Sequence, residues 1–169
     1  YVEEMGLLGL LEFYPADYIN DADDMGNMPI HRCCIHNQAE MLKAILKNEN
    51  VNINIPNSNN RTPLQIAAAN NNTYICQILL GAGADVDAAD EGSETALHSA
   101  IKHGAEGMVD LLIEKGADVN RMNVIGETPL ILATQVGSVQ MVKSLIAKGA
   151  DINARDNFGN TALSYATKA

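Results

Sequence analysis

The amino-acid sequence predicts an all-α repeat protein in which each repeat contributes two short helices. The segment GADVNRMNVIGETPL at residues 116–130 returns 33 residues later as GADINARDNFGNTAL at 149–163. An earlier copy, GADVDAADEGSETAL, occupies 83–97, and a more diverged one occupies 50–64. Of all residues 47% are hydrophobic but only 4% are aromatic, so alanine and leucine must fill the interior of small, closely packed helices. A period of this length is typical of a repeat array.

A threonine that precedes proline or alanine aligns the repeats. The aligned position holds, at spacings of 34, 33, 33 and 33 residues, Met28, Thr62, Thr95, Thr128 and Thr161. A threonine at a helix N-cap accepts a backbone N–H of the first turn, and a proline after it loses no hydrogen bond. We therefore expect the first helix of each repeat to begin here, with the capping hydroxyl missing at Met28.

The ends of the helices are marked by glycine and asparagine. The first helix is short and rich in small residues, as in LQIAAA (64–69), and a second, amphipathic helix such as GMVDLLIEK (107–115) follows. We expect left-handed caps after the first helix at Asn37, Asn71, Gly104 and Gly137. The second helix should end at Gly83, Gly116 and Gly149.

The 33-residue period, the Thr-Pro-Leu start, the alanine-rich first helix and the Gly-Ala-Asp-Val-Asn loop together resemble the ankyrin repeat. The resemblance covers roughly residues 16–169 and implies an all-α ankyrin-repeat solenoid of stacked helix-turn-helix units with β-hairpin loops. The expected divisions are an N-terminal capping helix and partial repeat in 1–22, repeats in 23–56, 57–89, 90–122 and 123–155, and a partial fifth repeat in 156–169.

The two ends of the sequence indicate that parts of the repeat array lie outside it. The fifth repeat stops after its first helix, so Leu163 and Ala166 should be partly uncovered. We expect the native chain to continue beyond Ala169 and, since it opens on Tyr1, to be part of a longer protein.

Charge and cysteine content restrict the partners and the compartment. The net charge of −10 argues against nucleic acid or an anionic membrane surface as partner. Three cysteines without framework spacing favour a reducing compartment, so we expect an intracellular protein, cytoplasmic or nuclear. No apolar run approaches the length of a membrane span, and no secretory signal is visible.

Two clusters of residues suggest a metal site and a catalytic site, but the sequence lacks the further residues that each would need. HRCCIH (31–36) holds four possible metal ligands, but a structural zinc site normally needs a second ligand pair from elsewhere. His98, Ser99 and His103 suggest a nucleophile and a base, yet no oxyanion donors or third orienting group accompany them. We therefore expect no catalytic activity, no metal and no cofactor.

The expected function is a protein–protein interaction scaffold, monomeric as this fragment, that binds a protein partner on its concave hairpin and first-helix face. A regulatory module of a larger enzyme or channel is the alternative, and an autonomous enzyme or metal protein is a third class. On the resemblance, the expected contact residues are Met25, Ile35, Arg61, Glu91, Glu94, Lys102, His103, Val124, Ile125, Glu127, Gln135, Val136, Asn157, Phe158 and Asn160. Phe158 and Ile125 are the expected anchors; alternatively, they pack hairpin against hairpin or against a missing next repeat.

Overall fold

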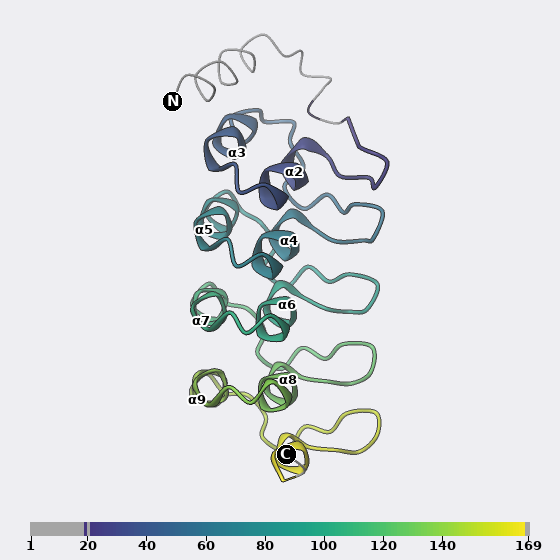
Figure 1. The fold of residues 1–169 in the computed structure, drawn as a ribbon, viewed down its shortest axis with the longest axis vertical. Helices are drawn as coiled ribbons and strands as arrows, with labels where there is room; N and C mark the ends of the chain where they lie inside the picture. Colours follow the sequence, from purple (N-terminus) through teal and green to yellow (C-terminus); the bar gives the residue numbers. More distant parts are fainter. Residues whose placement is uncertain (1–18, 20, 168–169) are drawn as a thin grey trace. The chain divides into compact units, whose positions relative to one another are not determined.

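The computed structural model describes residue 19 and residues 21–167 and divides the chain into two compact units (Figure 1). Unit 1 holds the described residues up to Ala84, and unit 2 holds those from Asp85 onward. The capping helix expected within 1–22 falls almost entirely on residues outside the described ranges. Each unit is a stack of short helices, as the repeat period predicts.

Two helix pairs form the described part of unit 1. α2 (Pro29–Ile35) is followed by α3 (Ala39–Ile45), and α4 (Pro63–Ala69) is followed by α5 (Thr73–Gly81). α2 packs against α4 and α3 packs against α5, so equivalent helices of successive repeats lie side by side. Asn72 reinforces this contact, because its Nδ2 donates to the carbonyl oxygen of Cys34 at 3.0 Å.

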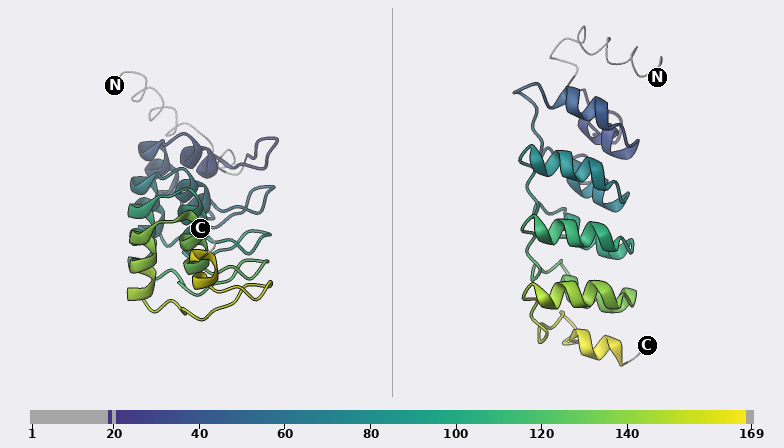
Figure 2. Two further views of the ribbon diagram at one scale, coloured as in Figure 1. Left: turned by 60° about the horizontal axis from the view of Figure 1, so that its bottom comes forward. Right: turned by 90° about the vertical axis from the view of Figure 1, so that its left-hand side faces the viewer.

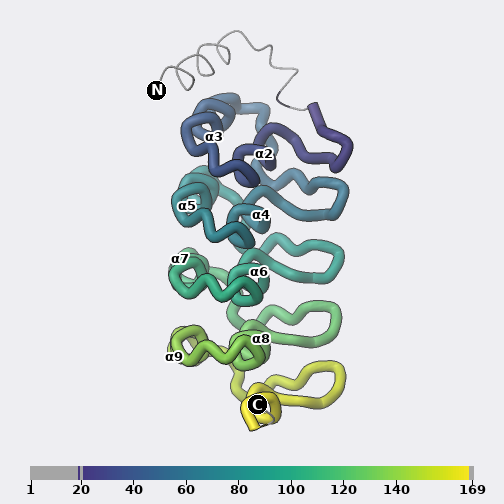
Figure 3. The backbone as a smooth tube through the Cα atoms, in the orientation of Figure 1, coloured from purple at the N-terminus to yellow at the C-terminus, as the bar shows by residue number. Residues whose placement is uncertain are grey.

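Unit 2 repeats the arrangement and adds one further helix. Its elements are α6 (Ala96–Lys102), α7 (Glu106–Glu114), α8 (Pro129–Val136), α9 (Val139–Ala147) and α10 (Ala162–Ala166). α8 packs between α6 and α10, while α7 packs against α9 on the outer side. The loops that lead into α6, α8 and α10 project on the side away from α7 and α9 (Figures 2 and 3). This places a row of loops on one side of the unit and the outer helices on the other.

The threonine position caps most of the first helices as predicted. The hydroxyls of Thr62, Thr128 and Thr161 each accept the backbone N–H three residues later at 3.3 Å. Thr95 differs, because its hydroxyl makes no cap hydrogen bond and lies 2.9 Å from His98 Nδ1. An acceptor nitrogen beside this hydroxyl attracts it as a donor, which the repeat pattern alone did not indicate.

Left-handed residues end the first helices, which confirms the expectation from sequence. The φ angles of Asn37, Asn71, Gly104 and Gly137 are 54°, 54°, 68° and 80°. Asparagine adopts this conformation more readily than other non-glycine residues because its side chain can hydrogen-bond locally. The reversal lets the second helix begin within a few residues, which produces the close pairing of α6 with α7 and of α8 with α9.

The loops have the shape of hairpins but contain no β-strand within the described residues. At the end of one loop, the N–H of Asn123 donates to the carbonyl oxygen of Glu127 at 3.1 Å, and the N–H of Gly126 donates back to Asn123 at 2.9 Å. These bonds close a tight turn. The remaining residues of the loop have no ladder of paired bonds, so the expected β-hairpin is a hairpin-shaped loop without strands.

The core consists of the same repeat positions in successive helices, and it ends at α10. Leu64, Leu97 and Leu130 are 1%, 0% and 2% exposed, whereas Leu163 at the equivalent position is 71% exposed. Ala166 is exposed as well, so the expectation that this helix face is uncovered is confirmed. In the part of the chain that the structure describes, each helix is too short to cross a membrane.

The missing cap at Met28 leads to a prediction about stability. Met28 makes no side-chain cap hydrogen bond to α2, while its own N–H donates to His31 Nδ1 at 3.0 Å. We expect Met28→Thr to raise the free energy of unfolding by about 0.5–2 kcal/mol, because the new hydroxyl would accept an N–H of the first helical turn as the threonines of other repeats do. Urea denaturation followed by circular dichroism measures the change, with Met28→Ala as a control that adds no acceptor. A Met28→Thr variant no more stable than the alanine variant would show that the position does not act as an N-cap.

Candidate functional site

The His–Cys cluster at residues 31–36 does not form a site. His31, Cys33 and Cys34 are buried, while His36 is exposed, so the four side chains do not converge on one point. Burial raises the pKa of Cys33 to about 12 and raises that of Cys34 as well, which keeps both thiols protonated and unreactive. Among the described residues, no three His, Cys, Asp or Glu side chains are grouped so that they could hold a metal ion.

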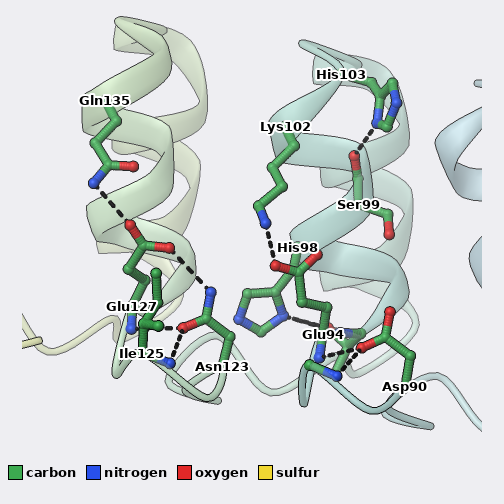
Figure 4. Close-up of polar contacts among 12 residues, drawn as sticks. Asp90, Glu94, His98, Ser99, Lys102, His103, Asn123, Ile125, Glu127 and Gln135 are labelled. Atoms are coloured by element: carbon green, nitrogen blue, oxygen red, sulfur yellow. Dashed lines mark hydrogen bonds and ion pairs between the residues drawn. The ribbon is translucent and has the colours of Figure 1, made fainter. Parts of the chain in front are cut away.

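In the second cluster, His98, Ser99 and His103, the two imidazoles make hydrogen bonds with the main chain, as Figure 4 shows. The Nε2 of His98 lies 3.1 Å from the carbonyl oxygen of Arg121, and Nδ1 lies 3.1 Å from the N–H of Thr95. Since a carbonyl only accepts and an N–H only donates, the ring is neutral with its proton on Nε2. His103 Nδ1 faces the main-chain oxygen of Ser99 at 2.8 Å. The hydrogen bonds of both imidazoles to main-chain groups stabilise the fold.

Three loop tips of unit 2 lie side by side, and they are named here by their first residues: the Asp90 tip (90–94), the Asn123 tip (123–127) and the Asp156 tip (156–160). The N–H of Val124 donates to the carbonyl oxygen of Gly92 at 2.9 Å, and that of Asn157 donates to Ile125 at 3.0 Å. Asn157 Nδ2 also donates to the carbonyl oxygen of Val124 at 3.0 Å. The tips are therefore joined in chain order by their backbones.

Side-chain oxygens fix the shape of each tip. Asn123 Oδ1 accepts the N–H groups of Ile125 and Glu127 at 3.2 and 2.9 Å. Asp156 Oδ1 accepts two N–H groups of its own tip in the same way, at 2.9 and 2.8 Å. The hydroxyl of Tyr165 in α10 donates to Asp156 Oδ2 at 2.6 Å, a bond that lowers the pKa of the carboxyl and raises that of the phenol. These hydrogen bonds stabilise the conformation of the Asn123 and Asp156 tips.

Gly126 shows how closely two tips approach. Its φ is +80°, and a Cβ at this position would lie 2.7 Å from the backbone nitrogen of Asn157. A side chain here would be strained in its own conformation and would also push the Asp156 tip away. The close approach brings the residues next to Gly126 within reach of the following tip.

Large apolar side chains are exposed along these joined tips. Val124 is 58% exposed, Ile125 43% and Phe158 76%. Met122, directly before the Asn123 tip, is 45% exposed. We call Met122, Val124, Ile125 and Phe158 the tip patch. Sequence analysis did not select Met122, because its position holds proline, alanine and arginine in other repeats and no residue type marks it.

Glu127 and its neighbours support the tips from within the unit. Glu127 is only 9% exposed, and its carboxylate accepts hydrogen bonds from Asn123 Nδ2 at 3.0 Å and Gln135 Nε2 at 2.9 Å (Figure 4). The equivalent residues one repeat earlier, Glu94 and Lys102, form an ion pair. Sequence analysis listed Glu127 among the contact residues, but its two oxygens hold the Asn123 tip onto α8.

The remaining residues selected from sequence lie at three places. In unit 1, Met25 and Ile35 are 58% and 40% exposed, and Arg61 is half-buried. At the ends of α6 and α8, the exposed residues are Lys102, His103, Gln135 and Val136. On the tips, Glu91 and Asn157 are exposed and Asn160 is half-buried. Val136 follows Gln135 at the end of α8 away from Ile125, so the structure does not bring it into the tip patch.

Short helix pairs, capped by threonine and followed by hairpin-shaped loops, define a helical repeat protein. The family model of ankyrin repeats matches the chain in three copies, at residues 7–90, 30–123 and 122–169. The chain therefore belongs to the ankyrin-repeat family. Ankyrin repeats are generally protein–protein interaction modules and are typically non-catalytic.

Proposed function

We propose that this chain is a non-catalytic protein-binding module whose partner sits across the loop tips of unit 2, anchored by Phe158 and Ile125. The observation that carries the proposal is the tip patch: neighbouring apolar side chains, between 43% and 76% exposed, on tips joined by backbone hydrogen bonds. A contiguous exposed apolar patch commonly marks an interaction site.

The rigidity of the tips supports this assignment. Binding costs free energy for every loop and side chain that must be ordered. Here Asn123 and Asp156 already order their tips, and Gly126 permits the tips to touch. Burial of apolar surface contributes about 25 cal/mol per Å², and an aromatic side chain such as Phe158 offers the largest single area. Less of the free energy gained at the patch would therefore be lost to ordering the tips.

Two further points belong to the proposal. Cys33, Cys34 and Cys76 are free thiols in the interior, and burial raises the pKa of Cys76 to about 12. Buried unpaired thiols suit a reducing compartment, so we propose that the protein acts inside the cell. We also propose that it binds as a monomer without a cofactor, since the tip patch needs no second copy and no bound group to be complete.

The test is the double variant Phe158→Ala with Ile125→Ser. Partners are captured from the source cell with the wild-type chain, identified, and titrated by calorimetry. We expect binding to the double variant to weaken at least tenfold, which is about 1.4 kcal/mol, because the two anchors of the patch are removed. The variant should remain folded, because substitutions of exposed side chains usually change stability little, and circular dichroism checks this.

A matched control separates the patch from apolar surface in general. Val139 is 67% exposed on α9, on the outer side of unit 2, and Val139→Ser should leave affinity unchanged. Unchanged affinity in a folded Phe158→Ala, Ile125→Ser variant would place the binding site elsewhere on the chain.

A further inference from the structure

We propose that the partner of the tip patch is a protein segment that places a lysine or arginine beside Glu91 while its apolar side chains cover Ile125 and Phe158. The inference rests on the proposed function and adds the chemistry of the partner. It follows from Glu91, an acidic side chain at the tip position where the next repeat has Val124.

Glu91 occupies the same repeat position as Val124 and Asn157. Because the N–H of Val124 donates to the carbonyl of Gly92, Glu91 lies on the tip next to the patch. Gly92 holds the position that Ile125 and Phe158 hold in the following tips, so no apolar side chain continues the row there. The apolar row thus ends at an exposed carboxylate.

The other carboxylates near this end are already engaged. Asp90 Oδ1 accepts the N–H groups of Gly92 and Glu94 at 2.9 and 3.0 Å. Glu94 pairs with Lys102. Within the described residues, the Glu91 side chain makes no ion pair or hydrogen bond, and it is exposed. The Glu91 carboxylate is therefore available to form an ion pair with a basic side chain of a partner.

The charge around the row is asymmetric. Residues 85–94 carry five acidic side chains and no lysine or arginine, and Lys102 compensates one of them. At the other end, Arg155 precedes the Asp156 tip and donates to the carbonyl oxygen of Gly159 at 2.8 Å. A positive charge on the partner is therefore favoured at the Asp90 tip and disfavoured beside Phe158.

The spacing sets the length of the partner segment. Packed helices lie about 8–10 Å apart, and Glu91 and Phe158 belong to tips two repeats apart, so the two side chains are separated by about 20 Å. An extended chain covers this distance in about six residues and a helix in about 13. A 16-residue segment is long enough in either conformation.

The experiment uses random 16-residue peptides displayed on phage and selected on the 169-residue chain. The selected peptides are synthesised and titrated against the wild type, Phe158→Ala and Glu91→Lys. Glu114→Lys is the matched control, because Glu114 is exposed at the end of α7, on the opposite side of unit 2 from the tips. We expect binders enriched in lysine or arginine together with large apolar residues.

Each variant has its own expected result. Phe158→Ala should weaken peptide binding at least tenfold and Glu91→Lys at least fivefold, whereas Glu114→Lys should change it less than twofold. Replacing the basic residue of the peptide by glutamate should restore binding to Glu91→Lys to within threefold of the original pair, and affinity should fall as salt rises.

The contrary results separate the inference from the proposed function. If Phe158→Ala weakens binding but Glu91→Lys does not, or if the binders lack basic residues, the inference is overturned while the proposed site stands. If neither variant weakens binding, both are overturned. Equal losses in Glu91→Lys and Glu114→Lys would overturn the assignment of Glu91, since they indicate a general charge effect.

Discussion

Replacing Leu130 by alanine is expected to lower the free energy of unfolding by about 2–5 kcal/mol, whereas the same replacement at Leu163 is expected to cost less than about 0.5 kcal/mol. The two leucines occupy the same repeat position, each two residues after its threonine cap, in α8 and α10. Leu130 is 2% exposed and Leu163 is 71% exposed. Truncation leaves a cavity at Leu130 and removes almost no buried area at Leu163.

Urea denaturation of both variants, monitored by circular dichroism, measures the two costs. Alanine has a slightly higher helix propensity than leucine, so the Leu163 variant could even gain a small amount of stability. The pair is matched in residue type and in position along the helix, which leaves coverage by neighbouring helices as the main difference. Equal losses for the two variants would show that Leu163 is buried when the protein is in solution.

The stability of the chain is also expected to fall between pH 7 and pH 5, because of buried histidines. Burial lowers the pKa of His98 below its ordinary value of 6.5, with the nearby Lys102 lowering it further and the Glu94 carboxylate opposing the shift. Burial lowers the pKa of His31 in the same direction. In this window the unfolded chain binds protons that the folded chain does not, so each downward step in pH favours unfolding.

The direction and the maximum size of this pH dependence follow from the coupling of proton binding to unfolding. The stabilisation is complete above the unfolded pKa of about 6.5 and is lost as pH falls through the lower folded pKa. Each histidine contributes a slope of at most about 1.4 kcal/mol per pH unit. Protonation of His98 would place a proton on Nδ1, where the N–H of Thr95 now donates, so the bond between them would break.

The chain itself supplies the control substitution. Gln65 occupies the position of His98 in the preceding repeat, and its Oε1 accepts the N–H of Thr62 at 2.7 Å. His98→Gln should therefore keep a cap bond while removing a titrating group, and the further substitution His31→Gln should remove most of the remaining slope. Unfolding in urea at pH 7, 6 and 5 measures the slope. If the double variant loses stability with pH as steeply as the wild type, the two histidines are not the cause.

Local features of the fold were predictable from the sequence because they depend on residues a few positions apart. The 33-residue period places the helix pairs, and threonine begins α4, α8 and α10 with a side-chain hydrogen bond. A left-handed asparagine or glycine follows α2, α4, α6 and α8. Each feature is set by a backbone conformation or by a hydrogen bond within one turn. The family followed from the same repeat positions and is confirmed by the family model.

The proposed binding surface can be derived from the sequence only in outline. Sequence comparison between repeats shows that Ile125 and Phe158 are equivalent, but it does not show which side chains the neighbouring tips leave exposed. Met122 was not selected for this reason. Glu127 was selected for contact although both its oxygens are held within unit 2, because the bond to Gln135 joins residues eight positions apart.

The sequence by itself determined the helix pairs of the described residues, most of their caps and the membership of the ankyrin-repeat family, since these rest on local conformational preference repeated at a fixed period. The tertiary structure decided what each repeated residue does. Leu130 and Leu163 are identical in type and position, yet one is in the core and the other is open to solvent. Among the described residues Glu91 has no ion pair, while Glu94 pairs with Lys102. The physical reason is that burial depends on neighbours from adjacent repeats and charge pairing depends on side chains several positions away, and both differ although the repeat pattern is the same.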